Sequence, residues 1–158
     1  MKDNMAKIAF TYGTLPKEGF ELLVPTVTSH LKDESVDEIV GDYVIEKVPN
    51  LILFIEECYR ILRPGGKAIF TSPNAASSTA WISPLTVRGI CESTLNFSSK
   101  DWREQYKFTD YTMRADFEVT GQFVVDQEAL ARSDEAKNFW LKRYMNVAQG
   151  IIFTLTKK

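Results

Sequence analysis

The stretch DESVDEIVGDYVIEKVPNLILFIEECYRILRPGGKAIFTSPN, residues 33–74, decides the fold. Its middle predicts a helix over 51–62, because apolar residues recur there at helical spacing and form one stripe: Leu51, Phe54, Ile55, Cys58, Tyr59 and Leu62. Pro64-Gly65-Gly66 ends this helix and turns the chain. Strands are predicted on both sides of this helix, at residues 36–44 and 67–72. The stretch therefore predicts a strand–helix–strand unit with parallel strands and a right-handed crossover.

Toward the N-terminus, two short strands are predicted. Residues 7–11, KIAFT, form the first. Residues 21–28 form the second, which Pro25 divides or confines to an edge of the sheet, because proline cannot donate to a strand ladder. Only residues 12–20 separate the two strands, too few for a helical crossover. The sequence leaves open whether a hairpin or a tight parallel connection joins them.

Toward the C-terminus, the sequence predicts a long excursion followed by a strand, a helix and a strand. Ser83-Pro84 predicts a short helix over 85–94, and residues 101–106 predict a helical turn. Strands are predicted at 117–125, with a bulge at Gly121, and at 151–156. Between these strands, Ser133 caps a helix whose expected apolar face consists of Ala136, Phe139, Trp140 and Tyr144.

Composition narrows the possible functions. The 158 residues are 44% hydrophobic and 25% charged, with a net charge of −2, which indicates one globular domain over residues 1–158 without a basic nucleic-acid footprint. No apolar run is long enough to span a membrane, and the first residues do not resemble a signal peptide, so we expect a soluble, cytoplasmic protein. With one histidine, His30, and two cysteines, Cys58 and Cys91, no metal site or catalytic triad is expected. Cys58 lies on the apolar stripe and is expected to be buried.

Residues 33–74 resemble the class I S-adenosylmethionine-dependent methyltransferases. Four pieces match that family's pattern in order: SVDEI at 35–39, YVIEKV at 43–48, RILRPGG at 60–66 and SPN at 72–74. The resemblance implies an α/β, Rossmann-like methyltransferase fold. The short N-terminal strands then make a reduced first half, and the last two strands make the family's closing antiparallel hairpin.

The resemblance also implies S-adenosylmethionine as the cofactor and an unknown molecule as the methyl acceptor. The chain departs from the family where cofactor is held. The loop Tyr12-Gly13-Thr14 has a single glycine, and Val24 or Pro25 stands where the family carries an acid that holds the ribose. Glycines let backbone N–H groups approach an anionic tail, and the acid accepts hydrogen bonds from two hydroxyls. A non-catalytic binding or partner module that has lost cofactor binding is therefore the alternative function.

The predicted site lies at the carboxyl ends of the strands, where open α/β sheets bind ligands. The predicted cofactor-binding residues are Tyr12, Gly13, His30, Asp42 and Tyr43. Asp42 is also the predicted catalytic residue, which would position the acceptor or act as a base, and Tyr43 would stack on an adenine or an acceptor. The alternatives are that Asp42 only caps the following segment, that Tyr43 is an aromatic residue at the edge of the core, and that His30 is a surface histidine.

We further expect a homodimer. A parallel sheet is normally covered on both faces, yet no helix-length segment exists between residues 7 and 36. Either the excursion over 75–115 folds back over the sheet, or a second copy of the chain covers it. Closed two-fold dimers are the commonest soluble oligomers, which favours the second copy, while a monomer capped by its own excursion remains the alternative.

Overall fold

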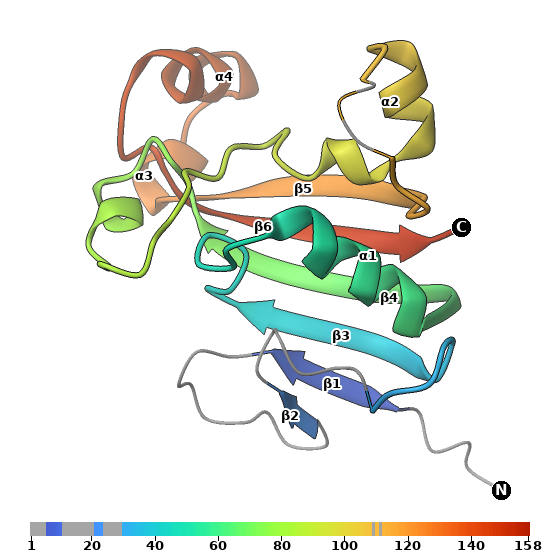
Figure 1. The fold of residues 1–158 in the computed structure, drawn as a ribbon. Coiled ribbons are helices and arrows are strands. Elements are labelled where there is room, and N and C mark those ends of the chain that lie inside the picture. Colours follow the sequence, from blue (N-terminus) through green and yellow to red (C-terminus); the bar gives the residue numbers. More distant parts are fainter. Residues whose placement is uncertain (1–5, 11–20, 24–29, 109, 111) are drawn as a thin grey trace, which may run out of the picture.

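The computed structural model describes residues 6–10, 21–23, 30–108, 110 and 112–158. They form one six-stranded sheet in the order β2-β1-β3-β4-β6-β5 (Figure 1). The strands are β1 (Lys7–Phe10), β2 (Glu21–Leu23), β3 (Val36–Asp42), β4 (Leu62–Pro73), β5 (Phe117–Val125) and β6 (Ala148–Lys157). The helices are α1 (Leu51–Ile61), α2 (Lys100–Gln105), α3 (Gln127–Leu130) and α4 (Asp134–Arg143), with the 3₁₀ turns η1 (Ser78–Trp81) and η2 (Asn96–Ser98).

The predicted strand–helix–strand unit is β3–α1–β4. β3 and β4 pair in parallel, and α1 buries four residues of the predicted stripe together with Ile61: Leu51, Phe54, Ile55 and Cys58. Tyr59 of the stripe is half-buried, and Leu62 is buried as the first residue of β4. The Asn50 side chain accepts a hydrogen bond from the Leu53 backbone N–H at 3.0 Å, which begins the helix. β4 starts earlier than predicted, because Leu62 already pairs with Val36 across an irregularity in the register.

Aromatic rings join α1 to the sheet beneath it. The Phe54 ring lies 5.0 Å from the ring of Phe10 in β1 and 5.6 Å from that of Phe70 in β4. Cys58 is buried on the same side, as predicted. These contacts make the face of the sheet under α1 the centre of the core.

β1 and β2 pair in parallel. Of the two connections that the sequence left open, the parallel one is therefore present and the hairpin is not. The connection itself, residues 11–20, lies outside the described residues. β1 also pairs in parallel with β3, so β1 has β2 on one side and β3 on the other.

The predicted closing hairpin is confirmed: β6 runs antiparallel to both β4 and β5 and lies between them. The register shift in this hairpin occurs between Val124 and Val125, so the prediction of a bulge at Gly121 was wrong. Gly121 instead lies close to the backbone of the excursion, where an added Cβ would come within 3.3 Å of the Glu92 carbonyl oxygen.

The predicted helix over 85–94 was also wrong. Residues 85–94 form turns and irregular backbone. Thr86 donates to the Ser83 carbonyl, but the next N–H, that of Val87, donates to the Glu46 carbonyl at 2.9 Å. The chain thus leaves the helical path because its backbone donors bond to the segment after β3. The helical turn predicted at 101–106 is confirmed as α2.

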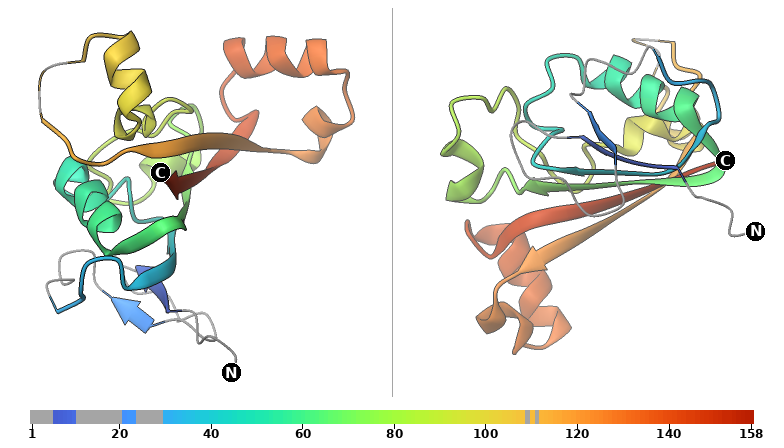
Figure 2. Two further views of the ribbon diagram at one scale, coloured as in Figure 1. Left: turned by 90° about the vertical axis from the view of Figure 1, so that its right-hand side faces the viewer. Right: turned by 90° about the horizontal axis from the view of Figure 1, so that it is seen from below.

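α4 forms where predicted, and its apolar face is not buried in the structure. α4 contains no buried residue; Phe139 is 49% exposed, and Tyr144, which follows the helix, is 57% exposed. Figure 2 shows α3 and α4 on the opposite side of the sheet from α1. The ring of Trp140 in α4 lies 6.3 Å from that of Tyr144, and the guanidinium of Arg132 lies 3.8 Å from the centre of the Trp140 ring. In the part of the chain that the structure describes, no helix is long and apolar enough to span a membrane.

Candidate functional site at the carboxyl edge of the sheet

The sheet has its topological switch point at β1. The chain passes from β1 to β2 on one side and then to β3 on the other, and all three strands run in the same direction. Neighbouring crossovers that diverge in this way leave a crevice outside the carboxyl ends of the strands. Asp42 and Tyr43 lie at this edge, because β3 ends at Asp42.

Asp42 and Tyr43 are held in place by backbone geometry. Asp42 is half-buried and pairs with Thr71 of β4, and the Tyr43 N–H donates to the Thr71 carbonyl at 2.8 Å. Tyr43 has a φ of +59°, a left-handed conformation that is strained for an aromatic residue. This bend turns the chain away from the strand and leaves the Tyr43 side chain 48% exposed.

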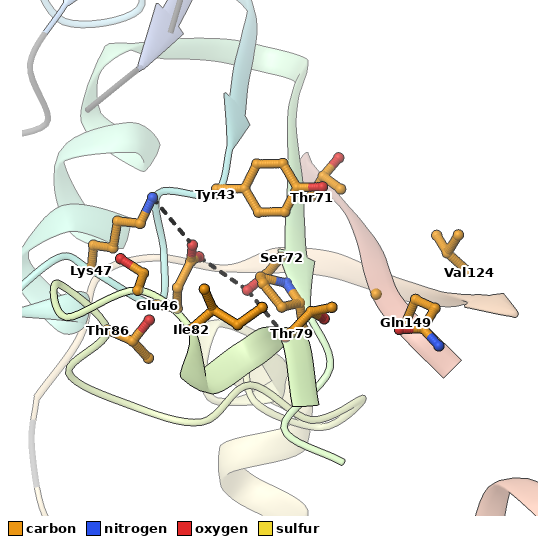
Figure 3. Close-up of a pocket in the computed structure, with 13 residues that line it drawn as sticks. Tyr43, Glu46, Lys47, Thr71, Ser72, Thr79, Ile82, Thr86, Val124 and Gln149 are labelled. Atoms are coloured by element: carbon orange, nitrogen blue, oxygen red, sulfur yellow. Dashed lines mark hydrogen bonds and ion pairs between the residues drawn. The ribbon is translucent and has the colours of Figure 1, made fainter. Parts of the chain in front are cut away.

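A cavity of about 390 Å³ opens beside Tyr43. It lies over the ends of β3 and β4 and the beginning of β6, and residues of the excursion close its lower side (Figure 3). Its volume is within the range of sites that bind small molecules. The lining residues are Tyr43, Glu46, Lys47, Thr71, Ser72, Pro73, Thr79, Ile82, Ser83, Thr86, Val124, Gln149 and Gly150.

Glu46 places a carboxylate at the wall of this cavity. Glu46 is only 3% exposed. Its Oε2 accepts a hydrogen bond from the Ser72 hydroxyl at 3.0 Å, and its Oε1 lies 3.8 Å from the Lys47 Nζ (Figure 3). Burial raises the pKa of the Glu46 carboxyl, while the bond from Ser72 and the charge of Lys47 oppose that rise. A weakly acidic, buried carboxyl group in a cavity is typical of functional sites.

The turn that carries Glu46 is fixed by the excursion. The guanidinium of Arg88 donates to the backbone carbonyls of Ile45, Val48 and Pro49. The Glu46 carbonyl accepts from the Val87 N–H in addition. These bonds hold the turn rigid although it has no regular secondary structure, so the carboxylate has a defined position.

The structure brings together some of the predicted site residues. Tyr43 lines the cavity, whereas Asp42 lies next to it but does not belong to its lining. His30 is exposed and does not lie at the strand end that carries Asp42. The next residue, Leu31, lies beside the last turn of α1, where its carbonyl accepts a hydrogen bond from Arg60. Tyr12 and Gly13 lie outside the described residues.

Glu46, Lys47 and Ser72 were not among the predicted site residues. Glu46 and Lys47 belong to the segment YVIEKV, whose resemblance to the family pattern was the available signal. Ser72 belongs to the piece SPN, which also matches that pattern, but its position next to Glu46 follows only from the pairing of β3 with β4. Within the described ranges, no group of three or more histidine, cysteine, aspartate and glutamate residues could hold a metal ion.

Comparisons with known proteins identify relatives of this chain. The sequence model of a family described as a methyltransferase domain matches residues 1–70. A probable S-adenosylmethionine-dependent methyltransferase of Mycolicibacterium smegmatis is 46% identical over 44 residues, which are 28% of this chain and 17% of that protein. The mitochondrial ubiquinone biosynthesis O-methyltransferase of Rattus norvegicus is 44% identical over 41 residues, 26% of this chain and 12% of that protein. The matched stretch thus spans less than a fifth of each of these curated relatives.

The fold is similar to that of solved methyltransferases. The crystal structure of a SAM-dependent methyltransferase from Archaeoglobus fulgidus superposes with a TM-score of 0.59 at 19% identity. The superposition covers 89% of this chain and 69% of that chain. At this identity the similarity concerns the fold.

The sheet order and the switch point define a Rossmann-like α/β domain with a cavity at the carboxyl ends of its strands, the edge where such sheets bind ligands. Residues 1–70 match the methyltransferase-domain model, and the fold is similar to that of solved S-adenosylmethionine-dependent methyltransferases.

Proposed function

We propose that this chain transfers a methyl group from S-adenosylmethionine to a small acceptor that occupies the cavity beside Tyr43. The observation that carries the proposal is the position of this cavity. It adjoins the switch point between β1 and β3 on the β4 side, so a cofactor over the switch point and an acceptor in the cavity would be neighbours. Tyr43 lies between the two positions.

The described residues at the switch point fit the cofactor. The half-buried carboxylate of Asp42 can accept hydrogen bonds from its hydroxyl or amine groups, and the half-exposed Tyr43 ring offers a face for its adenine. The loop at Tyr12 and Gly13 remains part of the proposed cofactor site. The bound cofactor supplies an activated methyl group on a positively charged sulfur. The protein then has to align the acceptor with that methyl group and to exclude water.

Calorimetric titration with S-adenosylmethionine and S-adenosylhomocysteine tests the proposal. We expect both to bind, and we expect Asp42→Asn to weaken binding by about ten- to a hundredfold, because a charged hydrogen-bond acceptor becomes neutral. Asp110→Asn is the matched control, since Asp110 is exposed and distant in sequence from the site. Folded protein that gives no heat with either compound at high micromolar concentration would favour the non-catalytic binding module instead.

We also propose a cytoplasmic location, which the two free cysteines support. Cys58 and Cys91 are unpaired with each other, and Cys91 is exposed. Exposed thiols persist in reducing compartments. Fractionation of cells that express the tagged chain tests this part of the proposal, and recovery from a secreted fraction would contradict it.

A further inference from the structure

We propose that Glu46 is the proton acceptor for a neutral hydroxyl group, phenolic or enolic, on the methyl acceptor, and that Lys47 stabilises the oxyanion that forms. This inference rests on the proposed function, because it assigns the chemistry of the acceptor in the same cavity. Three observations carry it: the position of the buried Glu46 carboxylate at the cavity wall, the charge balance of the cavity and the apolar character of the remaining wall.

Glu46 has the geometry of a base that faces a ligand. An ionised carboxylate can accept about four hydrogen bonds. In the described part of the chain, the Ser72 hydroxyl donates one bond at 3.0 Å, the backbone N–H of Glu46 also interacts with the carboxylate, and the Lys47 Nζ lies 3.8 Å from Oε1. Because Glu46 is buried yet lines the cavity, a hydroxyl group inside the cavity is the natural donor to its Oε1.

The charge balance of the cavity favours a neutral acceptor. Glu46 and Lys47 are the two charged residues in its lining, so their charges cancel. The sulfonium of the cofactor would add a positive charge next to them, and an ammonium group on the acceptor would be repelled by it. A hydroxyl group enters without charge, and the oxyanion that it becomes is attracted by both the sulfonium and Lys47.

The rest of the wall suits a molecule with an apolar body. Ile82, Val124 and the Tyr43 ring line the cavity together with threonine and proline side chains. Aromatic and aliphatic walls with a few converging polar groups are typical of sites for small, mainly apolar ligands. Phenols and enols combine such a body with a hydroxyl group that is acidic enough for a carboxylate to assist its ionisation.

The charged and polar groups around Glu46 are consistent with this role. Burial raises the pKa of Glu46 and makes its carboxylate a stronger base than an exposed one. Lys47 on the same turn and the Ser72 hydroxyl on β4 oppose this rise. Tyr43 faces the same cavity, and the guanidinium of Arg88 binds the neighbouring backbone carbonyls.

A hydroxyl acceptor would be methylated by displacement at the sulfonium. The oxygen lone pair attacks the methyl carbon of the sulfonium, a new C–O bond forms, and the C–S bond breaks with its electron pair left on sulfur. The hydroxyl proton moves to Glu46, which releases it to solvent after the products leave. The products are the methyl ether and neutral S-adenosylhomocysteine.

The experiment measures the affinity of 4-nitrophenol as a function of pH, with and without saturating S-adenosylhomocysteine. The wild-type site keeps one proton between Glu46 and the phenol, so we expect affinity to fall up to tenfold per pH unit above the pKa of the free phenol. In Glu46→Gln, Lys47 has no carboxylate partner and attracts the phenolate, so we expect affinity to rise with pH up to that pKa. The sign of the pH dependence therefore reverses. Glu128→Gln, at an exposed site on α3, should behave as wild type.

Two further variants keep the test informative if Glu46→Gln folds poorly. Lys47→Gln keeps the Glu46 carboxylate and removes the cation, so its affinity should still fall above the pKa of the free phenol, as in wild type. Ser72→Ala removes a hydrogen bond that lowers the pKa of Glu46. Its affinity for 4-nitrophenol should therefore change with pH in the same direction as that of wild type. Identical pH profiles in wild type and Glu46→Gln would overturn the proposal, as would a site that binds benzylamine in preference to 4-nitrophenol. If S-adenosylhomocysteine does not bind while the reversal occurs without it, the proposed methyl transfer fails and the assignment of Glu46 as the hydroxyl partner stands.

Discussion

Lys157 closes the carboxyl end of α1. Its side chain is 6% exposed, and its Nζ donates to the carbonyl oxygens of Tyr59 and Leu62 at 2.9 and 2.8 Å and to the Glu34 carboxylate at 3.2 Å. The ammonium also lies 4.5 Å from the centre of the Tyr59 ring. A cation in this position satisfies carbonyls that the helix leaves without partners and complements the helix dipole.

We expect Lys157→Met to lower the free energy of unfolding by about 2–4 kcal/mol, because buried carbonyls lose charged hydrogen-bond partners. Urea denaturation measures the change. Lys67→Met, at an exposed position of β4, is the control and should change stability by less than about 0.5 kcal/mol. Equal effects of the two substitutions would show that the bonds of Lys157 contribute nothing specific.

The raised pKa of Glu46 predicts that the free energy of unfolding depends on pH. Burial raises its pKa above the ordinary value of 4.5, so the folded state binds this proton more tightly than the unfolded state does. The stability that the group contributes is complete below pH 4.5 and is lost as the pH rises through the folded-state pKa. Glu46→Gln does not titrate, so its advantage over wild type should grow from pH 4 to neutral pH. Urea unfolding across this range measures it, and an advantage independent of pH would refute the explanation.

Among the elements, those with local signals were predictable. The stripe over residues 51–62 faces one side at helical spacing, so α1 and the β3–α1–β4 unit could be read from the sequence. The segment at 85–94 could not, since the Val87 N–H bonds to a carbonyl 41 residues earlier, at Glu46. Similarly, the strand end at Asp42 located the edge of the site, whereas the cavity is lined by segments distant in sequence that only the folded sheet brings together.

The beginning of α1 offers a test at the scale of an element. Asn50→Ala removes the side-chain oxygen that accepts from the Leu53 N–H and should cost about 1 kcal/mol of stability. Asn50→Asp keeps the acceptor and adds a negative charge at the positive end of the helix, so it should retain or exceed wild-type stability. Thermal unfolding of wild type, Asn50→Ala and Asn50→Asp measures these differences in stability. A loss in Asn50→Asp equal to that in Asn50→Ala would mean that the cap does not stabilise α1.

At the scale of the whole molecule, the homodimer remains a prediction. We expect the exposed apolar residues of α4 and the segment after it to form its interface. Phe139 and Tyr144 are about half exposed, and Met145 beside them is exposed as well. Exposed apolar clusters of this kind are typical of interaction surfaces. We expect light scattering at micromolar concentration to give twice the 18.0 kDa of one chain. Phe139→Asp should shift the mass toward one chain, whereas Glu118→Gln, at an exposed position of β5, should not; a monomeric wild type would contradict the prediction.

Because β6 lies between β4 and β5, the sheet cannot be completed until β6 has been synthesised. β6 is made after both neighbours, and Lys157 within it bonds to Glu34, Tyr59 and Leu62, which lie 123, 98 and 95 residues earlier. Until β6 is made, β4 has an unpaired edge, and β5 lacks the one described strand with which it pairs. Contacts this distant in sequence slow folding, and open strand edges invite pairing with other nascent chains. We expect the yield of folded protein in cells to depend on chain concentration and chaperone supply more strongly than on the stability of the finished fold.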